Sequence, residues 1–197
     1  TYDVTAPVFS NVTPVNDAVV KTSQVGYELG EALASGTITW TRTGGSDDSS
    51  SPHVINLAGT ELNAGTFSGE LATQPTLVDG AIYTISFNGQ DAAGNASTEV
   101  LVSNITYDVT APVFSNVTPV NDAVVKTSQV GYELGEALAS GTITWTRTDG
   151  SDDPSSPHVV NLAGTELNAG TFSGVLTNAP TLVDGAIYTI SFNGQDA

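Results

Sequence analysis

The chain contains no cysteine and no methionine among its 197 residues, and it has only two histidines. Without cysteine it can form neither a disulfide bond nor a thiolate metal site, and it lacks a thiol nucleophile. His53 and His158 each follow Ser-Pro in a polar stretch, where we expect them at the rim of the fold. Neither a Ser-His-Asp order nor a His-Glu-x-x-His motif is present, so we predict that the chain is not an enzyme and has no catalytic residues.

Basic residues are also scarce. Four Lys and Arg stand against 21 Asp and Glu, which gives a net charge of −17 at pH 7. Such a chain lacks the basic surface that binds nucleic acid, and it has no apolar run long enough to span a membrane. We therefore expect no nucleic-acid partner and no direct membrane insertion. Cations are the partners that suit this charge, although an acidic excess also serves solubility alone.

A long internal repeat accounts for the whole chain. Thr1 aligns with Thr106, and 85 of the 92 residues from Thr106 to Ala197 match the first copy at an offset of 105. A period of about 100 residues is the size of a domain rather than of a solenoid unit. We therefore predict two tandem domains, residues 1–105 and 106–197.

The second copy stops 13 residues short of the period, because it has no counterpart of residues 93–105. We expect the chain to be an excerpt from a longer array, with its second domain truncated at the last strand. An open sheet edge leaves backbone groups unpaired. The missing strand would then come from a continuation of the chain or from a neighbouring molecule.

Alternating apolar and polar residues recur in several stretches, which is the pattern of half-buried β-strands. We predict an all-β fold with about seven strands per copy, the number found in an immunoglobulin-like β-sandwich. Trp40 faces inward where this fold buries a tryptophan, and Tyr83 follows Asp79-Gly80 as in a tyrosine corner. The predicted strands of the first copy are 7–13, 23–29, 37–43, 53–58, 66–71, 81–89 and 98–105.

Carboxylates follow two of the inward-facing rows. Glu31 continues the inward row of the strand at 23–29, and Asp91 continues that of the strand at 81–89. These strands run the same way in opposite sheets, so both carboxylates should converge at the pole of the domain where Asp3 enters. Carboxylates gathered without a basic partner repel one another, and a set of oxygen ligands alone favours Ca²⁺ over zinc. The alternative is that they are solvated acids at the rim.

The repeat places the same set in the second copy, at Asp108, Glu136 and Asp196. Loops of the first copy would face this pole of the second copy. A cation bound by Asp108 would therefore lie between the domains and restrict their relative motion. This would explain why an aspartate occurs near the start of each copy.

Four motifs occur in a fixed order along the chain. The first is DVTAP, at 3–7 and again at 108–112, and we call the segment around it the seam. The others are YELGEAL, LVDGAIYTI and DAAGN at 91–95. Together they resemble the immunoglobulin-like, cadherin-like repeats of large secreted bacterial adhesins of the RTX type. The resemblance implies an extracellular, monomeric rod of repeats on the bacterial cell surface, which serves cell adhesion by projecting a distal binding domain.

In such repeats Ca²⁺ stiffens the junctions between neighbouring repeats of the same chain. The resemblance therefore implies the same ligands as the strand pattern, and it adds one, Asn95. The implied metal ligands are Asp3, Glu31, Asp91, Asn95, Asp108, Glu136 and Asp196.

The alternative function is an immunoglobulin-like module of a secreted protein that itself binds a glycan or a protein. Exposed aromatic residues would mark a glycan platform. Only Tyr2, Tyr107, Phe9 and Phe67 are candidates for the surface, whereas Trp40 and Tyr83 fall at core positions.

Overall fold

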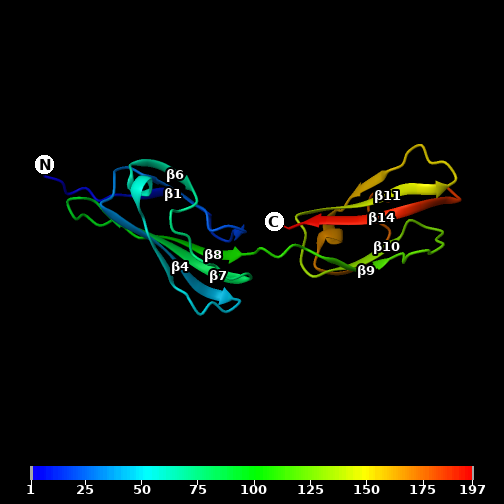
Figure 1. The fold of residues 1–197 in the computed structure, drawn as a ribbon, viewed down its shortest axis with the longest axis horizontal. Helices are drawn as coiled ribbons and strands as arrows, with labels where there is room; N and C mark the ends of the chain where they lie inside the picture. Colours follow the sequence, from blue (N-terminus) through cyan, green and yellow to red (C-terminus); the bar gives the residue numbers. More distant parts are fainter. Residues whose placement is uncertain (1, 197) are drawn as a thin grey trace. The chain divides into compact units, whose positions relative to one another are not determined.

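The chain folds into two compact units that divide between Thr110 and Ala111 (Figure 1). The structure is a computed structural model that describes residues 2–196. Each unit is an immunoglobulin-like β-sandwich, so the predicted fold class is confirmed. No helix in the described residues has the length and apolar composition that crossing a membrane requires.

The first unit packs a three-stranded sheet, β1-β3-β6, against a five-stranded sheet, β2-β8-β7-β4-β5. All pairs are antiparallel except β2 with β8, which is parallel. Its elements are β1 (Phe9–Thr13), β2 (Val19–Val20), β3 (Val25–Leu29), β4 (Ser35–Gly45), β5 (His53–Asn56), the 3₁₀ helix η1 (Gly59–Leu62), β6 (Gly65–Gly69), β7 (Ala81–Gln90) and β8 (Val100–Tyr107).

Each of the seven predicted strands overlaps an observed one, and β2 is the strand that the pattern missed. Two residues are too short to show an alternation, and β2 exists only through its pairing with Thr106 and Tyr107 of β8. The predicted domain boundary between 105 and 106 falls inside β8, so the first residues of the seam complete the last strand of the first unit.

The inward rows predicted from the alternation form the core. Trp40 and Tyr83 are fully buried and meet edge to face, with ring centroids 5.9 Å apart. The suggestion that Phe9 lies at the surface is wrong, because Phe9 is 3% exposed and packs on Tyr27. Phe67 is half-buried, since it pairs with Tyr27 across β3 and β6 and its ring stacks on that of Tyr27. The buried residues of the predicted rows are Val25, Tyr27, Leu29, Ile38, Trp40, Ile55, Leu57, Tyr83, Ile85 and Phe87.

The tyrosine corner is present, and its hydroxyl is hydrogen-bonded to the buried carboxylate of Asp48. The Tyr83 hydroxyl accepts a hydrogen bond from the Val78 amide at 3.0 Å and donates one to Asp48 Oδ2 at 2.8 Å. His53 Nε2 lies 2.6 Å from the same carboxylate oxygen. The expectation of a rim histidine is therefore corrected: the His53 side chain is 10% exposed and belongs to a buried polar cluster.

The second unit repeats this architecture with fewer strands. Its sheets are β13-β10-β9 and β12-β11-β14, and no residue in 2–196 pairs with the other edge of β14. Within residues 2–196 the second unit therefore has no counterpart of β8. The elements are β9 (Phe114–Thr118), β10 (Val130–Leu134), β11 (Ser140–Gly150), β12 (His158–Asn161), the 3₁₀ helix η2 (Gly164–Leu167), β13 (Gly170–Gly174) and β14 (Ala186–Gln195).

Candidate metal centre

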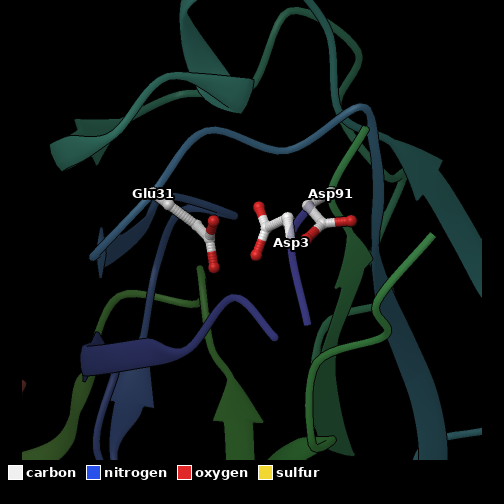
Figure 2. A group of neighbouring side chains, drawn as sticks. All are labelled: Asp3, Glu31 and Asp91. Carbon is white, nitrogen blue, oxygen red and sulfur yellow. The ribbon is translucent and has the colours of Figure 1, made fainter. Parts of the chain in front are cut away.

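Three carboxylates meet at one end of the first unit. Asp3, Glu31 and Asp91 each offer an oxygen, and these oxygens all lie within 4.8 Å of one another. Figure 2 shows Asp3 drawn between Glu31 and Asp91, with the three side chains coming from separate segments of the chain. Asp3 precedes β1, Glu31 follows β3 and Asp91 follows β7, so the group joins the seam to both sheets.

The loop after β3 is tied to the end of β7, which brings Glu31 close to Asp91. The Ala34 amide donates to the Gln90 carbonyl oxygen at 2.8 Å. Leu33 packs over Gly89, where its Cδ1 lies 2.8 Å from the position that a β-carbon would occupy. A side chain at residue 89 would push this loop away, so glycine there helps to place the carboxylate.

Asp91 is held in one orientation by its own loop. Its Oδ1 accepts hydrogen bonds from the amides of Ala93 and Asn95, both at 2.8 Å, and its Oδ2 accepts one from Asn95 Nδ2 at 2.8 Å. Burial raises the pKa of Asp91, but these hydrogen bonds together outweigh it and bring the pKa below its ordinary value. The carboxylate is therefore ionised at neutral pH although the residue is 4% exposed.

The surroundings of Glu31 disfavour the ionised form of its carboxylate. Burial raises its pKa above the ordinary value, and the negative charges of Asp3 and then Asp91 raise it further. Among the ion pairs found in residues 2–196, none includes a member of this group. In the described part of the chain, this end of the unit thus gathers negative charge that no ion pair offsets. A hard cation would stabilise such a group of carboxylates.

Asn95 connects the acidic group to the seam through its amide nitrogen. Besides Asp91, Nδ2 donates to the backbone carbonyl of Asp3 at 3.3 Å. Asp3 in turn accepts the amide of Thr5 at 3.0 Å, which closes a local turn around the DVT motif. Asn95 therefore acts in this structure as a hydrogen-bond donor that holds the first and last segments of the group together.

The set predicted for the second copy is divided between the two units. Asp108 belongs to the first unit, whereas Glu136 and Asp196 belong to the second. Asp108 accepts the amide of Thr110 at 3.0 Å, the same local turn that Asp3 forms with Thr5. These three residues remain a prediction from the repeat.

Asp79 has a role that the sequence pattern did not reveal. Its carboxylate accepts the amide of Val109 at 2.8 Å and the hydroxyl of Thr110 at 2.5 Å. The hydrogen bonds from Thr110 and Val109 lower the pKa of Asp79 below its ordinary value. The seam is therefore anchored to the first unit as it leaves β8. The Asp-Gly before β7 signals only a turn, so nothing in the sequence indicates this partner.

Comparison with known proteins adds little to this description. No family model matches the chain, and no curated protein matches it. Among solved structures, the FN1–FN3 domains of chicken CNTN1 are similar to it with a TM-score of 0.36 and 10% sequence identity. That alignment covers 97% of this chain, and the chain spans 60% of the length of that structure. This likeness carries no information on what the chain binds.

Proposed function

We propose that the chain consists of structural extender repeats of a bacterial cell-surface adhesin, in which Ca²⁺ binds at the seams and stiffens the array. The observation that carries the proposal is the group formed by Asp3, Glu31 and Asp91. It combines a seam residue with residues from both sheets in a domain that the chain repeats almost unchanged. A cation held by all three would couple the seam to the body of the unit.

The chemistry of the group fits Ca²⁺. Its ligands are oxygens alone, which is the donor set of Ca²⁺ and Mg²⁺ rather than of zinc. Asp91 is already oriented by three hydrogen bonds from its loop, so little ordering is needed there on binding. Asp3 is exposed and its carboxylate accepts one backbone amide, which leaves that side chain room to adjust.

The repeat extends the proposal to the second set, Asp108, Glu136 and Asp196. Because Asp108 belongs to the first unit and the other two to the second, a shared cation would restrict the motion of one unit against its neighbour. Asp79 supports this role, since it already fixes the seam residues Val109 and Thr110 on the first unit.

The exposure of the aromatic side chains favours a structural spacer over a glycan-binding module. Of the aromatic residues described, Tyr2 is 91% exposed, and the rest are buried or half-buried. One exposed ring does not form the stacked platform that a glycan would require.

The proposal predicts that Ca²⁺ raises the melting temperature of the chain. A ligand that binds only the folded state stabilises it by about 2.7 kcal/mol at a hundredfold excess over the dissociation constant. Calorimetry in chelator, in Ca²⁺ and in an equal concentration of Mg²⁺ should give the highest melting temperature in Ca²⁺, since Mg²⁺ demands a small octahedral shell. Identical melting curves in chelator and in Ca²⁺ would remove the metal from the proposal.

A further inference from the structure

We infer that Asp79 fixes the seam on the first unit as far as Thr110 without any metal, so that the joint between the two units is confined to Ala111 and Pro112. The hydrogen bonds of residues 106–110 carry this inference, and all of those named below lie within the first unit. They need no cation, because each donor has an acceptor in the protein itself. The attachment of the seam to the first unit is therefore separate from the Ca²⁺ binding proposed above.

The backbone of the first part of the seam is held from two sides. On one side the Asp108 amide donates to the Val20 carbonyl oxygen at 2.9 Å, which continues the parallel pairing of β2 with β8. On the other side the Gly80 amide donates to the Tyr107 carbonyl oxygen at 2.8 Å. Backbone pairing therefore holds the seam as far as Asp108, and a side chain has to hold whatever follows.

Asp79 extends the attachment by two residues. Its two carboxylate oxygens accept the Val109 amide at 2.8 Å and the Thr110 hydroxyl at 2.5 Å, and hydrogen bonds to an ionised acceptor are the stronger kind. The Thr110 amide is bound as well, to Asp108 Oδ1 at 3.0 Å. Apolar packing does not hold this segment, since Val109 is 55% exposed. The hydrogen bonds to Asp79 are therefore what keeps Val109 and Thr110 on the first unit.

The attachment stops at Thr110. In residues 2–196, no hydrogen bond involves Ala111 or Pro112, and the division between the two units falls directly before Ala111. Pro112 has a fixed φ and no amide hydrogen, and it restricts Ala111 to extended conformations. The joint is thus short and has few free torsions. Loss of the Asp79 carboxylate would lengthen it toward Val109, because that residue and Thr110 would lose their acceptor.

Amide relaxation and hydrogen exchange of the intact ¹⁵N-labelled chain in chelator test this inference. In the parent, the Val109 and Thr110 amides should be as ordered on the picosecond-to-nanosecond timescale as those of β8, and Ala111 should be more mobile. In Asp79→Ala, exchange at Val109 should be about tenfold faster. Asp79→Asn keeps an oxygen acceptor for this amide and should fall between the two. Asp47→Ala, which removes an exposed acid of the same unit, should match the parent.

Thr110→Val separates the attachment of the seam from the stability of the unit, because it removes the hydroxyl and leaves Asp79 in place. Exchange at Val109 should be faster in this variant too, while the core amides of β7 exchange as in the parent. The inference is overturned if Val109 and Thr110 of the parent are as mobile in chelator as Ala111. Unchanged exchange at Val109 in Asp79→Ala would also overturn it, as would equal acceleration at Val109 and at the β7 amides in Thr110→Val.

Discussion

Asp48→Ala is expected to destabilise the first unit by about 3 kcal/mol. The Asp48 carboxylate accepts the Tyr83 hydroxyl at 2.8 Å and the Ser50 amide at 3.0 Å, and it lies 2.6 Å from His53 Nε2. Alanine would leave these groups without their acceptor beside a tyrosine that is 0% exposed. Denaturant unfolding in a Trp145→Phe background, followed through Trp40 fluorescence, would isolate the first unit.

Two variants serve as controls for this effect. Asp47 is the neighbouring acid, its side chain is 87% exposed, and it makes a 3.6 Å contact with Arg42, so Asp47→Ala should change stability by about 0.5 kcal/mol at most. Asp153→Ala removes the same cluster from the second unit, where Tyr188 is half-buried and water can replace the lost acceptor. We expect a smaller loss there. Equal effects of Asp47→Ala and Asp48→Ala would show that the buried cluster contributes nothing.

The same cluster predicts a dependence of stability on pH. The hydrogen bond to His53 is the largest cause that lowers the pKa of Asp48 below its ordinary value, and it prevails over burial, which raises it. A depressed folded-state pKa means that this stabilisation is complete above the unfolded pKa of about 3.9 and is lost as pH falls through the folded value. The parent should therefore lose stability below about pH 4 more steeply than Asp48→Ala does.

Glu61→Ala is expected to cost a comparable amount of stability, about 3 kcal/mol, because it removes two hydrogen bonds that a buried carboxylate accepts from backbone amides. Glu61 is 3% exposed, and its carboxylate accepts the amide of Ala58 at 2.7 Å and that of Ala72 at 2.6 Å. It thereby connects η1 to the segment after β6. The Tyr27 hydroxyl donates to the Glu61 carbonyl at 2.7 Å, which places this connection directly on the core.

The repeat itself supplies the control for Glu61. Glu70 is an exposed glutamate nearby, and the second copy has Val175 at the corresponding position. Glu70→Val should therefore leave the free energy of unfolding almost unchanged, while Glu61→Ala lowers it clearly. Thermal unfolding of both variants checks this, and a Glu61→Ala protein as stable as the Glu70→Val protein would contradict the assigned role.

Alternation of apolar and polar residues was enough to predict every strand of the first unit except β2, because a strand's buried face repeats every second residue. Trp40, Tyr83 and Phe87 all lie in the core as this pattern predicts. The pattern carries no information on buried polar groups. Asp48 and Tyr83 are 35 positions apart, so their contact depends on the pairing of β4 with β7 rather than on any local signal.

The acidic group could be predicted in part for the same reason. Glu31 and Asp91 continue inward rows of two strands that run in the same direction, so extending those rows brings them together. The hydrogen bonds that orient Asp91 and the anchoring of the seam by Asp79 depend on loop conformations, which no periodicity describes.

Calorimetric titration of Ca²⁺ into the metal-free chain and into Glu31→Gln, with Asp47→Asn as the matched control, is the most direct measurement of calcium binding at the seam. Glutamine keeps the shape of the side chain and removes its negative charge, and Ca²⁺ affinity depends on the number of charged ligands. We predict saturable binding to the parent and to Asp47→Asn, and a loss of about tenfold or more in affinity at one site of Glu31→Gln. A parent chain that takes up no Ca²⁺, or a Glu31→Gln chain that binds it as tightly as the parent, would contradict the account.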